Sequence, residues 1–358
     1  MGDAGSVDAI THAKAAGLHY VDHAGPGITR RRHGRHFSYV DPRGQAISDP
    51  DEIARLKRLA IPPAYRDVWI CPDPDGHLQA VGRDARGRLQ YRYHPKWRLV
   101  RDEDKFAKVL IFGEVLPKLR RRVDADLRSP GLDRERVLAS VVSLMEKTLA
   151  RVGNDEYATA NNSFGLTTLR HDHADVQGRH LTFDFRAKHG IERHIDLSDP
   201  RLARVIGRLQ DLSGQRLFQY LDDEGQAHII HSQDVNAYLR EATGEDITAK
   251  DFRTFAATQL AALALASFEA VDTKARAKKN LLRTIETVAA KLGNTPAICR
   301  KSYIHPEVMN GYLDGSLREA LLKRAESALE DADAFSLGAD ELAVTAYLAR
   351  RLRKRKAT

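Results

Sequence analysis

The feature that most constrains the fold is a change in the spacing of apolar residues near position 104. Before it, short apolar stretches alternate with turns, as in His36–Val40 followed by Asp-Pro-Arg-Gly at 41–44, which predicts β-strands. After it, apolar residues recur at helical spacing. The two patterns in succession predict an α+β protein, with a small β-rich N-terminal domain at 1–102 and a larger, mainly α domain at 103–358.

The N-terminal domain is expected to consist of hairpins. Strands are predicted at Val68–Cys71, Leu78–Val81 and Leu89–Tyr93. Glycine-containing turns separate them, one over Asp73–Gly76 and one centred on Gly87. The acidic turn lacks the glutamate that completes a calcium-binding loop, so we interpret it as a plain turn. One short helix is predicted at about 50–59.

The larger domain begins with a strongly periodic segment, from Val137 to Val152, after a possible N-cap at Asp133. An embedded antiparallel sheet is expected next, with strands at Phe164–Leu169, Leu181–Phe185 and Arg193–Leu197. Lys188 lies in the connection at 186–190, beside Gly190. The sheet therefore presents a lysine on a tight hairpin.

Helices are predicted to resume at 201–212, 233–242, 249–269 and 278–292. Ser232 and Thr248 are suitable N-caps, and Gly244 and Gly293 are suitable helix ends. The most apolar stretch, Phe252–Phe268, is interrupted by polar residues and predicts a buried core helix. It is shorter than the roughly 20 apolar residues that a membrane-spanning helix needs.

Cysteine usage and the N-terminal residues bear on the compartment. The two cysteines, Cys71 and Cys299, exclude a disulfide framework and a cysteine zinc site, and they fit a reducing interior. The first residues include acids and lack the apolar core of an export signal. We therefore expect a cytoplasmic protein.

The distribution of charge favours a nucleic-acid partner. The chain has 57 basic and 49 acidic residues, a formal net charge of +8. From Arg83 to Arg101, basic side chains outnumber a single acid, Asp84, and alternate with Tyr91, Tyr93 and Trp97. Basic residues pair with phosphates, and interleaved aromatics can reach bases or sugars. Further basic clusters occur at 30–32, 118–122, 274–283 and 350–356, the last of which we interpret as a solvated tail.

The segment that carries the chemistry is Gly293-Asn-Thr-Pro-Ala-Ile-Cys-Arg-Lys-Ser-Tyr303-Ile-His-Pro. Taken alone, its tyrosine could be a half-buried aromatic. Three upstream segments favour a catalytic role; they are Leu149-Ala-Arg151-Val-Gly-Asn, Phe185-Arg-Ala-Lys188-His-Gly and Thr248-Ala-Lys250-Asp-Phe-Arg253-Thr-Phe.

In order and spacing, these segments resemble the active-site motifs of type IB DNA topoisomerases of the poxvirus-like and bacterial branch. The stretch Gly82–Tyr93 is similar to the DNA-clamping segment of that branch. The resemblance covers roughly residues 60–310. It implies a DNA breaking-rejoining fold with a tyrosine recombinase-like catalytic domain, and a monomer that acts on double-stranded DNA in the nucleoid. The residues expected to bind DNA are Arg83, Gln90, Tyr91, Tyr93 and Lys250.

The resemblance also implies a role for each motif residue. Tyr303 would be the nucleophile and form a 3′-phosphotyrosine. Arg151 and Arg253 would bind the phosphate, because guanidiniums stay charged and bond bidentately to its oxygens. Lys188 would be the general acid for the 5′ oxygen, since neighbouring cations favour loss of its proton. Rejoining reverses cleavage, so no ATP, metal or other cofactor is expected, and His171-Asp-His173 is interpreted as a polar turn.

One position departs from the family pattern. Nine residues before the nucleophile, many relatives carry a histidine, and this chain has Asn294. An amide NH₂ can donate a hydrogen bond to a phosphate oxygen, but it cannot be a cation or relay protons. We therefore expect Asn294 to be catalytic as a neutral donor.

Two other functions remain open from the sequence. A tyrosine recombinase shares the fold, but such enzymes usually have a histidine where Lys250 stands, and they lack the clamp-like motif. A non-catalytic DNA-binding protein would explain the basic clusters. It would not explain the ordered set of Arg151, Lys188, Arg253 and Tyr303.

Overall fold

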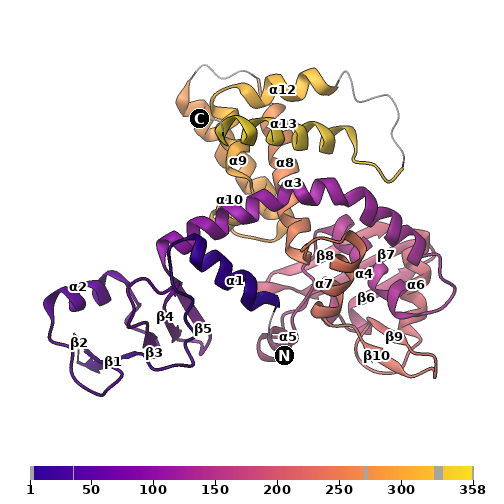
Figure 1. Cartoon of the computed structure of the whole chain (residues 1–358). Helices are drawn as coiled ribbons and strands as arrows, with labels where there is room; N and C mark the ends of the chain where they lie inside the picture. Colours follow the sequence, from indigo (N-terminus) through magenta and orange to yellow (C-terminus); the bar gives the residue numbers. More distant parts are fainter. Residues whose placement is uncertain (1–3, 35, 270–272, 326–333, 357–358) are drawn as a thin grey trace. The chain divides into compact units, whose positions relative to one another are not determined.

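The computed structural model describes residues 4–34, 36–269, 273–325 and 334–356 (Figure 1). The chain divides into two compact units, Met1–Lys105 and Phe106–Thr358. The division lies within helix α3 (Pro95–Asp126), as does the expected domain boundary after residue 102. Helical structure thus begins at Pro95 rather than near residue 104, because proline is favoured in the first turn of a helix. In the part of the chain that is described, no helix is long and apolar enough to cross a membrane.

Unit 1 contains a five-stranded antiparallel sheet in the order β2-β1-β3-β4-β5. Its strands are β1 (Ile28–His33), β2 (His36–Val40), β3 (Arg66–Ile70), β4 (Leu78–Arg83) and β5 (Leu89–Tyr93). The predicted hairpins are confirmed, since β3 pairs with β4 and β4 with β5. Helix α2 (Pro50–Arg58), also predicted, is capped by Asp49 and buries Leu56 in the core of the sheet.

Helix α1 (Ala4–Ala15) was not predicted. It contributes Ala13 to a small separate core with Leu18 and Trp97, the last from the first turn of α3. The apolar residues of α1 are mostly alanines, so the contrast between its faces is too weak to show a helical period.

Unit 2 is built around helix α4 (Arg134–Thr148), whose residues from Arg136 to Met145 are all buried. Asp133 caps it as predicted. Around α4 pack α6 (Pro200–Gln210), α7 (Ser232–Thr243), α8 (Ala249–Ala266) and strand β9 (Gln219–Leu221). The predicted α+β fold is therefore confirmed, although Ser232 is the first residue of α7 and not its cap, a position that His231 occupies.

The embedded sheet has the order β6-β7-β8, with β6 (Ala174–Gln177), β7 (His180–Arg186) and β8 (Glu192–Ser198). The predicted strand at Phe164–Leu169 was wrong, since Leu166–Thr168 forms a 3-10 turn. A Cβ at Gly165 would lie 2.6 Å from both the carbonyl oxygen of Arg151 and the nitrogen of Gly153. This backbone contact holds the segment against the chain that follows α4 and determines its conformation.

The remaining elements complete unit 2. They are α5 (Asp155–Asn161), β10 (Ala227–Ile229), α9 (Lys274–Leu292), α10 (Pro296–Ser302), α11 (Pro306–Leu313), α12 (Ser316–Ala325) and α13 (Ala339–Lys356). In Figure 1, α9, α12 and α13 surround α8. The basic tail was interpreted as solvated, and its basic residues Arg350, Arg353 and Lys354 are exposed. Arg351 departs from that interpretation, because it is half-buried and pairs with the buried Glu307.

Candidate active site

Four of the five predicted catalytic residues, Arg151, Lys188, Arg253 and Tyr303, line one cavity of about 280 Å³. They come from the end of α4, the β7–β8 hairpin, α8 and the end of α10. Lys250, expected to bind DNA, lies on the same wall. Among the described residues that line this cavity, none is acidic. It is therefore a concentration of cations around a tyrosine, which suits an anionic group.

Arg253 holds two helix ends together. It is 4% exposed, and its guanidinium donates to the carbonyls of Leu149, after α4, and Leu292, at the end of α9, the latter at 2.7 Å. Leu149 has a left-handed backbone (φ 56°), which costs a non-glycine residue roughly 1 kcal/mol. Helix C-termini carry partial negative charge, so these carbonyls offset the desolvation of a buried cation.

Arg151 and Asn294 lie side by side. The Arg151 guanidinium donates to the side-chain oxygen of Asn294 and, at 3.1 Å, to the carbonyl of Gly293. The Nδ2 of Asn294 is buried and lacks an acceptor among the described residues. Asn294 does not line the cavity itself. Its direct contact is thus with Arg151, and its amide NH₂ remains available as a donor.

Tyr303 ends the short helix α10 and is half-buried. The Arg253 guanidinium carbon lies 5.3 Å from the centre of its ring. Its backbone is held by Thr258 of α8, whose hydroxyl donates to the Tyr303 carbonyl at 3.2 Å and accepts from the backbone nitrogen of His305 at 3.1 Å. One buried hydroxyl on the helix of Arg253 therefore fixes the chain on both sides of Ile304.

The charges in the cavity act on Tyr303. Burial raises the pKa of its hydroxyl, but the cations Arg253, Arg151 and Lys250 outweigh burial, so the pKa lies below its usual value. Burial, together with repulsion from Arg253, lowers the pKa of Arg151 to about 10, which leaves it a cation near neutral pH. The site thus favours a tyrosinate, the stronger nucleophile.

Lys188 projects from the turn between β7 and β8, where His189 and Gly190 both have positive φ (69° and 74°). Its ammonium lies 5.1 Å from the centre of the Tyr157 ring, a cation–π contact across the cavity wall. Because the side chain is exposed on a tight hairpin, it can approach a ligand in the cavity.

The DNA-binding residues expected in unit 1 lie on β4 and β5. Tyr91 and Tyr93 stack with ring centres 6.2 Å apart and are 43% and 37% exposed. Gln90 alternates to the other face of β5 and donates to Asp84 at 3.0 Å. Arg83 is exposed and donates to the carbonyl of Gly87 at 2.9 Å. The aromatic pair and Gln90 thus do not share one surface of the strand.

The histidine pair was interpreted as a turn, and this is confirmed. His171–His173 forms a 3-10 turn in which His171 contacts the carbonyl of Arg216 at 2.9 Å. Within the described ranges, no group of three or more His, Cys, Asp or Glu side chains could hold a metal ion.

Sequence reasoning missed two residues near the site, Thr258 and Arg193. Arg193 had been assigned only to a strand, but it donates to the carbonyls of Thr148 and Lys291. Both residues act on backbone groups, which every amino acid supplies, so no side-chain pattern could reveal them. Thr258 has one visible trait, that it is a polar residue in a stretch that is otherwise largely apolar and buried.

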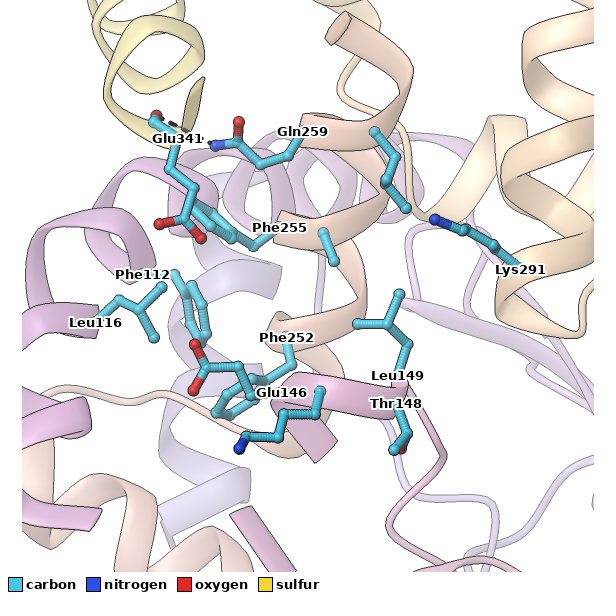
Figure 2. Close-up of a pocket in the computed structure, with 13 residues that line it drawn as sticks. Phe112, Leu116, Glu146, Thr148, Leu149, Phe252, Phe255, Gln259, Lys291 and Glu341 are labelled. Atoms are coloured by element: carbon cyan, nitrogen blue, oxygen red, sulfur yellow. Dashed lines mark hydrogen bonds between the residues drawn. The ribbon is translucent and has the colours of Figure 1, made fainter. Parts of the chain in front are cut away.

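A second cavity, of about 320 Å³, is lined by residues of α3, α4, α8, α9 and α13 (Figure 2). Phe112, Phe252 and Phe255 form its apolar wall. Glu146 and Glu341 lie on one side of it and Lys291 on the other, as Figure 2 shows. Arg120 donates to both glutamates, so the two carboxylates share one cation.

Comparison with known proteins identifies the family. The model of the eukaryotic DNA topoisomerase I catalytic core matches residues 94–327, and that of the bacterial DNA topoisomerase IB N-terminal domain matches residues 36–84. DNA topoisomerase 1B of Acanthamoeba polyphaga mimivirus is 32% identical over 293 residues, 79% of this chain and 86% of the relative. DNA topoisomerase 1B of vaccinia virus (strain Copenhagen) is 21% identical over 277 residues, 75% of this chain and 84% of the relative. The resemblance to this family is confirmed, and the chain belongs to the type IB DNA topoisomerases.

Proposed function

We propose that the protein relaxes supercoiled double-stranded DNA by cutting one strand, letting it rotate and rejoining it, without ATP or a metal ion. The observation that carries this proposal is the cavity in which Arg151, Lys188, Lys250 and Arg253 surround Tyr303 with no acidic side chain among the described lining residues. Such a cavity stabilises the charge that develops on a phosphate during displacement.

In the cleavage step, the Tyr303 oxygen attacks the phosphorus as its own proton is lost. The bond from phosphorus to the 5′ oxygen breaks, and Lys188 gives a proton to that oxygen. Arg151 and Arg253 bind the non-bridging oxygens, which gain charge in the transition state. The product is a 3′-phosphotyrosine and a free 5′ hydroxyl.

The 3′-phosphotyrosine retains the energy of the broken bond, so religation is the reverse of cleavage and requires no ATP. Between the two steps the free 5′ end rotates about the intact strand. Unit 1 serves as the DNA clamp, with Arg83 near phosphates and Tyr91 and Tyr93 near the groove. Affinity for DNA should fall steeply with salt, because phosphate contacts dominate it. We infer that the enzyme acts as a monomer in the cytoplasm, at the nucleoid.

Asn294 contributes to this reaction as a neutral donor. The unpaired Nδ2 supports a hydrogen bond to a phosphate oxygen, and the contact with Arg151 supports a second effect through the orientation of that guanidinium. The position thus stabilises the transition state without taking part in proton transfer.

The decisive experiment is relaxation of supercoiled plasmid in the presence of a chelator and without ATP. Wild-type protein should relax the plasmid and form a covalent adduct with DNA. Tyr303→Phe should form no adduct while still binding DNA, because only the hydroxyl is lost. Tyr312→Phe, whose hydroxyl accepts from Asn280 at 2.7 Å outside the cavity, is the matched control and should remain active. DNA binding without relaxation or adduct by the wild type would refute the proposal.

The role of Lys188 has its own test. Lys188→Ala should slow cleavage far more than it weakens binding. A substrate with a 5′ sulfur leaving group needs no proton, so it should restore the rate of the variant. Failure of this substrate to do so would show that Lys188 is not the general acid.

A further inference from the structure

The ends of helices α4 and α9 are joined by three arginines in successive layers. Arg193 bonds to the carbonyls of Thr148 and Lys291, at 3.4 and 3.1 Å. Arg253 bonds to those of the next residues, Leu149 and Leu292. Arg151 then bonds to Gly293 and Asn294, as described above. Arg193 and Arg253 thus span the gap at successive residues, and Arg151, which itself follows α4, reaches across to the α9 end.

Arg193 is placed in the first layer by the sheet. It pairs with Phe185 across the β7–β8 ladder, so both side chains lie on the same face, and Phe185 is part of the core of unit 2. A Cβ at Gly293 would lie 3.5 Å from a nitrogen of Arg193. The guanidinium is therefore fixed between the hairpin that carries Lys188 and the end of α9.

Arg193 lies outside the cavity in which a phosphate is proposed to bind. Arg193 is not among the residues that line the catalytic cavity. It lines instead a much smaller space of about 10 Å³, which Arg151 and Arg253 also border. Its two bonds go to helix C-terminal carbonyls, which attract cations. Burial and repulsion from Arg253 lower the pKa of Arg193, so the carbonyls offset an unfavourable location.

We propose that Arg193 is a positioning residue for DNA cleavage, which fixes the separation of the α4 and α9 ends and so orients Arg151 and Asn294 toward the scissile phosphate. The inference rests on the proposed function. Without Arg193, only Arg253 among the three arginines still bonds to carbonyls of both helix ends, so the distance from Arg151 to Gly293 and Asn294 is held less firmly. Displacement of a catalytic group by about 1 Å is enough to slow a reaction by about 10²-fold.

The test measures single-turnover cleavage at saturating DNA, together with DNA affinity. Arg193→Met should lower the cleavage rate about tenfold or more and leave affinity nearly unchanged, because binding does not need the precise orientation of Arg151. Arg179→Met is the matched control. It removes the same charge from the exposed β6–β7 turn of the same sheet and should cleave like the wild type.

A double-mutant cycle separates positioning from a general loss of structure. Since Arg193 is proposed to act through Arg151, Arg193→Met should have little further effect in an Arg151→Met background. Equal losses in both backgrounds, or a wild-type rate for Arg193→Met, would overturn the inference. Absence of cleavage by the wild type would instead refute the proposed function.

If Arg193→Met does not fold, Arg193→Lys keeps the charge but has no planar fork to reach both carbonyls. It should lose part of the cleavage rate, and this loss should also vanish in the Arg151→Met background. A melting temperature equal to that of the wild type, with the rate reduced, supports positioning. A rate equal to that of the wild type contradicts it.

Discussion

The proposed catalytic cavity and the second cavity of unit 2 are similar in volume but differ in charge balance. The catalytic cavity, of about 280 Å³, has four cationic side chains and no acidic one among its described lining residues. The second, of about 320 Å³, has two lysines and two glutamates. Helix α8 contributes to both, with Lys250 and Arg253 in the first and Phe252 and Phe255 in the second.

Uncompensated charge, and not volume, thus distinguishes the cavity proposed as the active site from the second one. In the second cavity Arg120 bonds to both glutamates, and Lys147 pairs with Asp199. In the first, repulsion among cations destabilises the empty protein and is relieved only when an anion enters. Neighbouring residues of a helix point about 100° apart, so α8 can present Phe252 to one cavity and Arg253 to the other.

The largest expected effect comes from removing one lysine of each cavity. Lys250→Met should slow DNA cleavage about 10²-fold at saturating DNA, because it removes a cation that stabilises the developing charge. Lys291→Met changes an exposed lysine at the second cavity instead, and it should leave the rate unchanged. Single-turnover cleavage measures both. Equal losses in the two variants would mean that overall charge, and not its location, controls the reaction.

Removing the cation that the two glutamates of the second cavity share should change the stability of the protein and not its cleavage rate. Arg120→Met leaves Glu146 and Glu341 without their shared cation, so the free energy of unfolding should fall by about 2 kcal/mol. The folded variant should still cleave DNA at the wild-type rate. Urea unfolding measures the change, with the exposed Arg318→Met as a control that should cost little. A slower cleavage step by folded Arg120→Met would contradict the separation of the two cavities.

Thr258, also on α8, links stability with catalysis. Thr258→Val keeps the shape but leaves the buried nitrogen of His305 without an acceptor, which should cost roughly 1 kcal/mol of stability. Cleavage should slow as well, since the Tyr303 backbone loses its support. Thr258→Ser keeps the hydroxyl and should restore the rate more than the stability. If valine and serine cleave equally well, the hydroxyl does not position the nucleophile.

The smallest expected effect is a displacement of the pH profile. Because the pKa of Tyr303 lies below its usual value, the cleavage rate should rise with pH and level off before the ordinary pKa of a tyrosine. Lys250 is one of the cations that lower this pKa, so Lys250→Met should move the profile to higher pH, and Lys291→Met should not. The test is to measure the cleavage rate of each variant across a range of pH and to normalise it to that variant's maximum. An identical profile for the two variants would show that Lys250 does not act on Tyr303.

Much of the fold could be predicted from the sequence, because local patterns determine it. The hairpins of unit 1 and the caps at Asp133 and Thr248 depend on nearby residues alone. The predictions were wrong where contacts between residues far apart in the sequence determine the local structure. Phe164–Leu169 is apolar enough for a strand, but the close approach of Gly165 to the chain after α4 prevents one. Helix α1 was not predicted because its apolar residues are mostly alanines, so the difference in hydrophobicity between its faces is small.

The same division applies to the site. The motifs predicted Tyr303, Arg151, Lys188 and Arg253 as site residues, because the proposed chemistry requires particular side chains in a particular order. They did not place Lys250 beside the nucleophile, and Arg193 and Thr258 went unnoticed. These two bind carbonyls and amides of residues far away in the sequence, so only the folded chain reveals them.

The ion pair between Arg351 and Glu307 has a consequence for the order of synthesis. Glu307 is buried at the start of α11, four residues after Tyr303, and its partner lies on α13. The ribosome therefore makes the nucleophile before it makes the arginine that secures the helix behind it. A chain interrupted between the two positions would carry Tyr303 while α11, the helix that follows it, still lacked this ion pair.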